Sequence, residues 1–175
     1  MLFMQPGFSL SILSALCSLL LISCKNYSVS VNDNTVYTPA PLFSNYQVAD
    51  PKLHDCITQT IYDLHITKAE ELTRLNCSNA GIVSLQGLDR FFALAELNLA
   101  NNQVTDITAL GKLGRLEILL LNNNQINTST VLLNLLHLQT LDLTMNPALA
   151  CGDLYQLADN LKPQKPELIL PEQCR

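Results

Sequence analysis

The stretch LAELNLANNQVTDITALGKLGR, residues 94–115, belongs to a pattern that returns along the chain at a fixed interval. Copies of the pattern begin at residues 72, 94, 116 and 138, so each step is 22 residues and no insertion breaks the register. Periods of about 20–50 residues are typical of proteins that stack one short structural unit. Four in-phase copies make chance an implausible source of the pattern, and they predict a stacked repeat.

Each copy predicts one short strand followed by a bend. Leucines alternate with other residues over the strand, and alternate side chains of a strand point to opposite faces. The inward positions are Leu97, Leu99, Leu119, Leu121, Leu141 and Leu143. Full burial of each such leucine should contribute about 1.5–3 kcal/mol. Because one copy cannot close a core, stability must come from the stacking of neighbouring copies.

An asparagine follows the strand at the bend of the last three copies. These residues are Asn102, Asn124 and Asn146. A buried asparagine can bond backbone groups of its own turn and of the next, so the three predict a ladder of hydrogen bonds. Ala80 stands at the equivalent position of the first copy, which predicts that the ladder starts late. Ser129 replaces Ile107 of the preceding copy, and we expect a local irregularity there on the convex side.

The pattern LxxLxLxxN resembles the leucine-rich repeat, whose period is about 20–29 residues. The 22-residue length and the later apolar positions, NxVxxIxxLxxL, resemble the internalin-like subclass, and the resemblance covers roughly residues 50–175. It implies an α/β solenoid: a short, curved leucine-rich repeat with about five parallel strands on its concave face. Residues 72–150 would form four repeats between a helical N-terminal cap and a disulfide-closed C-terminal cap.

The ends of a solenoid expose its core and need caps. Residues 50–71 predict the N-terminal cap, because Asp50 can cap a helix over residues 51–64 and Pro51 suits its first turn. Spacings of three and four place one apolar face on this helix, formed by Leu53, Cys56, Ile57, Thr60, Ile61 and Leu64. Residues 151–175 predict the C-terminal cap, with a helix at 151–161 and a fifth strand at 167–170.

The N-terminal segment predicts export from the cytoplasm. Residues 8–22 are apolar or small and uncharged, and they are too short for a membrane-spanning helix of about 20 residues. The sequence Leu21-Ile22-Ser23-Cys24 resembles the lipobox of bacterial lipoproteins. That resemblance implies a signal peptide over residues 1–23 and a lipid on Cys24. Lys25 after the cysteine then favours the outer membrane. The alternative is a plain signal peptide or short anchor helix in which Cys24 is incidental.

Residues 24–49 predict a flexible, lipid-anchored tether, because they are polar, contain two prolines and show no sustained period. The alternating stretch YSVSV, residues 27–31, leaves an extra edge strand as the alternative.

Cysteine positions predict two disulfides. Cys17 would leave with the signal peptide and Cys24 would carry the lipid, so four cysteines remain. Cys56 on the cap helix and Cys77 in the first strand face the same end of the core, and Cys151 and Cys174 flank the C-terminal cap. Other pairings would span the whole solenoid, which disulfide geometry does not allow. A reduced, buried Cys56–Cys77 pair is the alternative for the first two.

Composition and motifs argue against nucleic-acid binding, metal binding and enzymatic activity. The net charge is −5 and no basic cluster occurs, which excludes nucleic acid as an expected partner. The three histidines, His54, His65 and His137, are far apart in sequence and lack metal-ligand spacing, so they predict surface residues. No hydrolase, metalloprotease or phosphate-loop motif is present. We expect a protein without enzymatic activity, cofactor, metal or small-molecule substrate.

The outward strand positions predict a protein-binding face. Most are small and polar, but Ile118 and Leu120 are apolar residues at the centre. Apolar side chains rimmed by polar ones are typical of interaction hot spots. The residues expected to contact a protein partner are Ile118, Leu120, Asn98, Asn122, Asp142 and Glu96. The alternative function is a structural or assembly component of the bacterial envelope, in which no single face has a dedicated ligand.

Overall fold

The structure, a computed structural model, describes residues 29–31, 34–37 and 39–175. The chain divides between Pro41 and Leu42 into two units, and the second unit, Leu42–Arg175, holds the repeats. The signal peptide expected over residues 1–23 and the expected lipidation site, Cys24, lie outside the described residues. Nothing in the structure therefore tests these two predictions.

Part of the expected tether is a β-hairpin. Strand β1 (Val29–Val31) pairs antiparallel with β2 (Asn34–Tyr37). For Val29–Val31, the described part of YSVSV, the structure has a strand, but this strand pairs with β2 in a two-stranded sheet of its own and is not an edge strand of the repeat sheet. The alternation of valine with serine over residues 29–31 is the physical reason, since it suits a pleated strand better than an irregular linker.

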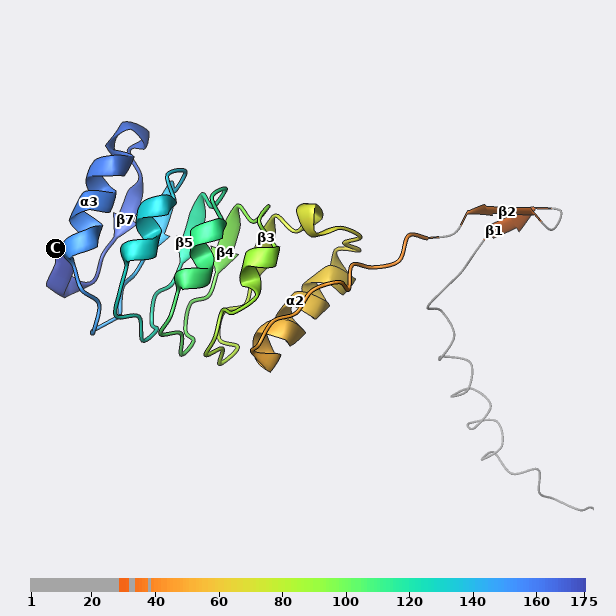
Figure 1. The fold of residues 1–175 in the computed structure, drawn as a ribbon, viewed down its shortest axis with the longest axis horizontal. Coiled ribbons are helices and arrows are strands. Elements are labelled where there is room, and N and C mark those ends of the chain that lie inside the picture. The colour runs from red at the N-terminus through yellow and green to blue at the C-terminus, as the bar shows by residue number, and fades with distance from the viewer. Residues whose placement is uncertain (1–28, 32–33, 38) are drawn as a thin grey trace, which may run out of the picture. The chain divides into compact units, whose positions relative to one another are not determined.

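Five parallel strands form one sheet in the order β3-β4-β5-β6-β7 (Figure 1). The strands are β3 (Arg74–Asn76), β4 (Glu96–Asn98), β5 (Ile118–Leu120), β6 (Thr140–Asp142) and β7 (Glu167–Ile169). Strand follows strand without a slip, because Leu75, Leu97 and Leu119 pair in register across the sheet. The expected fold is confirmed: the unit is a short, curved leucine-rich repeat solenoid with the sheet on its concave face.

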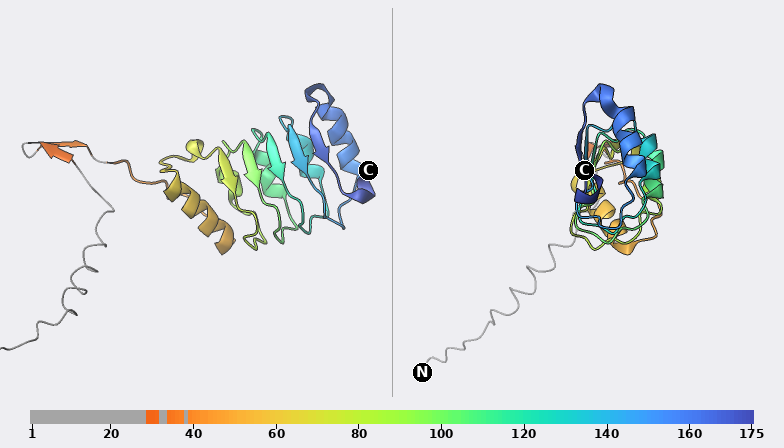
Figure 2. Two further views of the ribbon diagram at one scale, coloured as in Figure 1. Left: turned by 180° about the vertical axis from the view of Figure 1, so that it is seen from behind. Right: turned by 90° about the vertical axis from the view of Figure 1, so that its left-hand side faces the viewer.

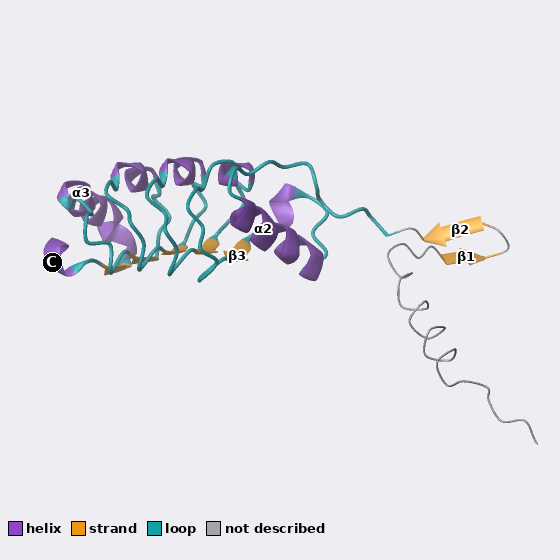
Figure 3. Cartoon of the chain, turned by 90° about the horizontal axis from the view of Figure 1, so that it is seen from below, coloured by secondary structure: helices purple, strands orange, loops and turns teal. Residues whose placement is uncertain are grey.

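Helical turns form a second layer behind the sheet (Figure 3). One 3-10 helix per repeat and then helix α3 lie in this layer, and an end-on view shows strands on one side and helices on the other (Figure 2). These elements are η3 (Leu88–Arg90), η4 (Thr108–Lys112), η5 (Thr130–Asn134) and α3 (Gly152–Leu161). The inward-facing leucines of the repeats fill the space between the layers and are almost completely buried.

The irregularity expected at Ser129 is absent from the described repeats. Ser129 precedes η5 with φ −118° and ψ 2°, close to the φ −110° and ψ 15° of Ile107 before η4. Its buried hydroxyl donates to the carbonyl of Ala150 at 3.4 Å. This hydrogen bond satisfies the polar group, so the serine takes the isoleucine position without disturbing the backbone.

Helix α2 (Pro51–Asp63) closes the N-terminal end of the core. Leu53, Ile57 and Ile61 are its buried residues, and Asp50 caps it by accepting hydrogen bonds from the backbone N–H groups of residues 52 and 53. The assignment of Leu64 to the apolar face is wrong. The helix ends before it, and its side chain is 61% exposed.

Residues 42–49, which we call the strap, belong to the folded unit although they were expected in the tether. The Phe43 N–H donates to the carbonyl of Ile66 at 2.9 Å, and the rings of Phe43 and Tyr46 meet Phe91 edge-on at 6.1 and 5.2 Å. Gly87, at φ 93°, lets the strap come close, since a Cβ atom there would lie 2.1 Å from the Gln47 carbonyl oxygen. The folded unit therefore begins at Leu42 rather than Asp50.

Two disulfides fasten the caps, and both predicted pairings are confirmed. Cys56–Cys77 joins α2 to the residue after β3, with 5.9 Å between the Cα atoms, and Cys151–Cys174 joins the start of α3 to the C-terminal turn, with 5.2 Å. The remaining short elements are the 3-10 helices η2 (Ala69–Glu71), η6 (Lys162–Gln164) and η7 (Glu172–Cys174).

Three buried asparagines link consecutive repeats. The side-chain amide of Asn124 donates to the carbonyls of Leu99 and Leu121, both at 3.0 Å, and its oxygen accepts from the Val104 N–H at 3.0 Å. Asn102 and Asn146 make the equivalent bonds one repeat earlier and one repeat later. Each amide thus satisfies backbone groups of two adjacent turns, which fixes the stacking distance of the solenoid.

Candidate functional site

The outward-facing side chains of the sheet form rows that cross the strands. Because the strands pair in register, residues that lie 22 apart stand side by side from β3 to β6. One row runs Arg74, Glu96, Ile118, Thr140, Glu167, and the next runs Asn76, Asn98, Leu120, Asp142, Ile169. The strand β5 therefore places its two apolar side chains next to each other, with polar neighbours on both sides.

A groove of about 490 Å³ lies between the end of helix α2 and strands β3 to β5. Ile118 and Leu120 line it from β5, and Leu64 lines it from the end of α2. The other residues that line it are Thr60, Asp63, Arg74, Leu75, Asn76, Glu96, Leu97 and Asn98. Two aliphatic side chains of β5 and one from the end of α2 thus border the same hollow.

The structure gathers only part of the predicted binding set in this groove. Glu96, Asn98, Ile118 and Leu120 line it together, whereas Asn122 and Asp142 lie on the sheet outside its lining. Ile118 and Leu120 are half-buried rather than fully exposed. Ala100, the next position in outward alternation after Asn98, is only 7% exposed, so it adds almost no accessible surface to this face.

Sequence reasoning missed the contribution of the cap helix. Thr60, Asp63 and Leu64 line the groove, yet the helical spacing assigned Leu64 to the core. No local sequence signal identifies it, because the helix ends where His65 takes a left-handed φ of 54°, and a histidine rather than a glycine or asparagine stands there. A left-handed residue ends a helix, and the side chain before it no longer follows the buried stripe.

Hydrogen bonds hold several polar side chains of the sheet in place. The carboxylate of Asp142 accepts from the N–H and the hydroxyl of Thr144, at 2.9 and 2.7 Å. The side-chain oxygen of Asn98 accepts from the Ala100 N–H at 3.0 Å. The carboxylates of Glu96 and Glu167 make no hydrogen bond or ion pair with another residue that the structure describes, so they are available to a ligand.

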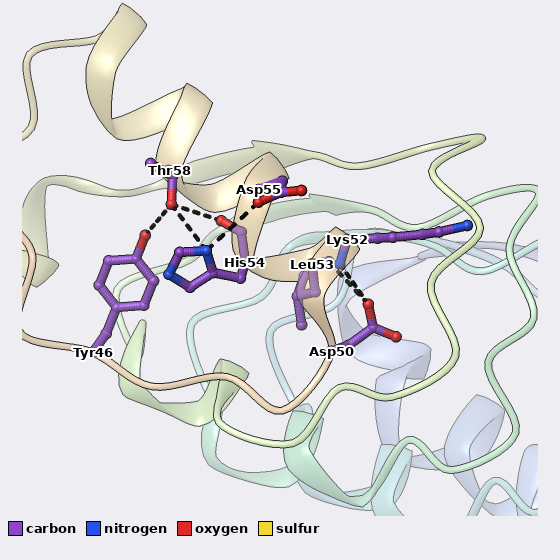
Figure 4. Close-up of polar contacts among 7 residues, drawn as sticks. All are labelled: Tyr46, Asp50, Lys52, Leu53, His54, Asp55 and Thr58. Atoms are coloured by element: carbon purple, nitrogen blue, oxygen red, sulfur yellow. Dashed lines mark hydrogen bonds and ion pairs between the residues drawn. The ribbon is translucent and has the colours of Figure 1, made fainter.

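A second polar cluster lies on the outer face of α2 (Figure 4). The Tyr46 hydroxyl is 2.7 Å from the Thr58 hydroxyl, and the Tyr46 ring stacks on His54 with 5.5 Å between centroids. The Thr58 hydroxyl donates to the His54 carbonyl at 2.8 Å. These contacts attach the strap to the cap helix, and His54 is exposed beside them.

The other histidines lie elsewhere on the surface. His65 follows α2, and His137 lies 2.9 Å through Nδ1 from the Gly114 carbonyl oxygen. Within residues 29–31, 34–37 and 39–175, no three histidine, cysteine, aspartate or glutamate side chains are placed to hold a metal ion. The same described ranges contain no helix long and apolar enough to cross a membrane.

Asp50 is the buried carboxylate of the cap. Besides its two bonds to α2, it accepts hydrogen bonds from the N–H groups of Val83 and Ser84, at 2.8 and 3.1 Å. Burial raises the pKa of this carboxyl, but the four backbone donors together outweigh burial and leave the pKa below its ordinary value of 3.8. The charged form of Asp50 is therefore part of the folded structure.

Comparison with known proteins shows the fold of the chain. No protein-family model matches the sequence, and the curated proteins give no match either. Among solved structures, an internalin (InlF) from Listeria monocytogenes is similar, with 23% identity, a TM-score of 0.57, and coverage of 76% of this chain and 45% of that one. Internalin C2 from the same species shares 22% identity, with a TM-score of 0.58 over 68% of this chain and 53% of that one.

The chain spans about half the length of these two structures. At this level of identity the likeness concerns the path of the backbone and not the residues of the groove. The chain therefore has the leucine-rich repeat fold seen in internalins.

Proposed function

We propose that this chain is a non-enzymatic protein-binding module and that its partner binds the concave sheet at the groove beside α2. The observation that carries the proposal is the apolar pair Ile118 and Leu120, side by side on a polar sheet and facing the exposed Leu64 across the groove. A leucine that loses its remaining exposed surface to a partner stabilises the complex by about 25 cal/mol for each Å² covered.

Rigidity supports the same proposal. The two disulfides, the asparagine ladder and the leucine core fix the strands that carry the groove. A surface that is already ordered loses little conformational entropy when a partner binds, so more of the contact energy appears as affinity. The internalin-like fold is a further argument, because solenoids of this kind present extended concave surfaces for binding.

The proposed location is the bacterial envelope. A signal peptide over residues 1–23 and a lipid on Cys24 would anchor the protein to a membrane, most consistently the outer membrane, and the segment up to Pro41 would separate the anchor from the repeats. The disulfides support a lipid on Cys24. The four cysteines of the folded unit pair with one another, so none of them is left as a partner for Cys24. Mass spectrometry of the mature protein should find an acylated N-terminal Cys24, and an unmodified Cys24 would contradict the anchor.

Substitution of the apolar pair tests the binding proposal. Ile118→Asp and Leu120→Asp place charges in the groove while the inward leucines of β5 stay intact, so the fold should survive, as circular dichroism can verify. Each variant should lose the protein that the unmodified chain captures from envelope extracts. The matched control is Tyr155→Asp, which alters an exposed residue on α3, in the helical layer. Capture that is equal for folded Leu120→Asp and unmodified protein would refute the proposal.

A further inference from the structure

Carboxylates stand on both sides of the apolar pair. In the sheet register, Glu96 on β4 is the neighbour of Ile118, and Asp142 on β6 is the neighbour of Leu120. Glu167 on β7 ends the row of Ile118, beyond Thr140. The centre of the sheet is therefore apolar, with a negative charge one strand away in either direction and a further one at the far edge.

Few positive charges compensate these carboxylates. Arg74 on β3 is the one cation among the outward positions of the five strands, and it stands next to Glu96 in the register. No ion pair found in the described part of the chain involves a side chain of the sheet face; the three that occur lie on α2, in the helical layer and at the end of α3. Glu167 and Asp142 have no positive neighbour on their own strands or on β5.

We propose, as a refinement that rests on the proposed function, that the partner presents an extended segment in which a bulky apolar side chain is flanked on both sides by lysine or arginine. The apolar side chain would contact Ile118 and Leu120, and the flanking cations would approach Glu96 on one side and Asp142 and Glu167 on the other. An acidic segment would bring like charges together over an apolar contact, and this repulsion disfavours it.

The spacing of the sheet agrees with such a segment. Neighbouring strands lie about 4.8 Å apart, so Glu96 is about one strand spacing from Ile118 and Glu167 about two. An extended chain that crosses the strands advances about 3.3 Å per residue, and its alternate side chains face the sheet about 6.6 Å apart. A cation two residues before and two residues after the apolar side chain therefore reaches the carboxylates on each side.

A pair of short labelled peptides tests this preference for flanking cations, which we call the charge rule. The peptides are added to the full chain in detergent. One peptide has leucine at its centre, lysine two residues to each side, and serine and glycine elsewhere; the other has glutamate in place of lysine. Fluorescence anisotropy should show binding of the lysine peptide at least tenfold tighter than that of the glutamate peptide. Leu120→Ser should weaken binding of the lysine peptide, because this variant removes the apolar contact and leaves the carboxylates unchanged.

Neutral variants identify the carboxylates involved. The double variant Glu96→Gln with Glu167→Gln should weaken binding of the lysine peptide about fivefold and flatten its dependence on salt. Glu172→Gln, which removes an exposed charge from η7, should change neither. Equal binding of the two peptides, or an unchanged affinity in the double variant, would overturn the inference. If Leu120→Asp still loses the captured partner in that case, the binding face stands and only the charge rule fails.

Discussion

Asp50 joins two parts of the molecule that are 33 residues apart in sequence. One carboxylate oxygen accepts from the first turn of α2, and the other accepts from the N–H groups of Val83 and Ser84 in the first repeat. The sequence predicted the first role from the pattern Asp-Pro before an apolar stripe. It could not predict the second, because no local pattern states which distant loop reaches the same side chain.

Removal of this carboxylate should destabilise the fold. Asp50→Ala deletes a helix cap and leaves two partly buried N–H groups of the repeat without their acceptor, so the free energy of unfolding should fall by about 2 kcal/mol. Urea denaturation with the disulfides intact measures this quantity. Asp55→Ala, an exposed change on the same helix, should have an effect within about 0.5 kcal/mol of zero. Equal effects of the two substitutions would show that Asp50 has no special part.

Acid should weaken the same contact. The pKa of Asp50 is lower in the folded protein than its ordinary value of 3.8, so the charged form binds the four backbone donors and the protonated form does not. Stability from this group is present above pH 3.8 and is lost as the pH falls through the lower, folded pKa. Denaturation at neutral pH and near pH 3 should therefore show a smaller loss of stability in Asp50→Asn than in the unmodified protein. A loss of the same size in both would contradict the assignment.

Met145 occupies a backbone position that suits asparagine. Its φ is 57°, and the residues one, two and three repeats earlier, Asn123, Asn101 and Asn79, have φ of 55°, 59° and 58°. The methionine side chain is 66% exposed, so little packing is lost when it changes. Because asparagine tolerates this left-handed region better, Met145→Asn should raise the free energy of unfolding by about 0.5–1 kcal/mol.

Met145→Leu is the matched control, since leucine meets the same backbone strain and should leave stability unchanged. Thermal unfolding of both variants measures the difference. A Met145→Asn protein that unfolds at the temperature of the leucine variant, or below it, would show that backbone conformation at this turn does not limit stability.

At the scale of elements, the caps depend on covalent links. The Cys56–Cys77 disulfide closes a loop with a sequence separation of 21 and fastens α2 to the first strand. The loop-entropy description gives such a link about 3 kcal/mol. The double substitution Cys56→Ser with Cys77→Ser should lower the free energy of unfolding by about that amount, measured by urea denaturation without reductant.

A reductant provides the control for that prediction. It should destabilise the unmodified protein by more than it destabilises the double variant, which still contains Cys151–Cys174. Equal sensitivity to reductant in the two proteins would contradict a stabilising role for the first disulfide.

Regular elements were predictable from the sequence, and their irregular neighbours were not. The helices α2 and α3 and all five strands of the sheet follow from apolar spacing, because a buried stripe needs the same residue type at every turn or alternate position. The strap was missed because its few aromatic residues, among them Phe43 and Tyr46, have no period. Their role depends on Phe91, which lies more than 40 residues further along the chain.

Ser129 shows the opposite kind of error. The sequence predicted a local irregularity at this residue, but the backbone there is regular. A hydroxyl at an isoleucine position appears unfavourable by hydropathy alone, but the Ala150 carbonyl from the next turn accepts its hydrogen bond. Satisfaction of a buried polar group depends on which chain segment lies opposite, and a single repeat does not contain that information.

For the whole molecule, the solenoid is a rigid scaffold for one asymmetric face. The repeat register predicted that Ile118 and Leu120 would stand together at the centre of the sheet, and the structure has them there. The groove itself was not predictable, because it also needs Leu64, and the direction in which that side chain leaves α2 is set by the end of the helix and its packing on the first repeat. One half of the site thus belongs to the repeat and the other half to the cap.

Photocrosslinking in cells tests the central claim, that the concave face binds a protein partner, most directly. A photoreactive amino acid placed at Leu120 should give one discrete adduct with another protein, and the same group at Tyr155 on α3 should not give that adduct. An adduct between two copies of this chain would instead support the assembly function. If positions 120 and 155 give the same pattern, or if position 120 gives no adduct while position 155 does, the concave face is not the binding site.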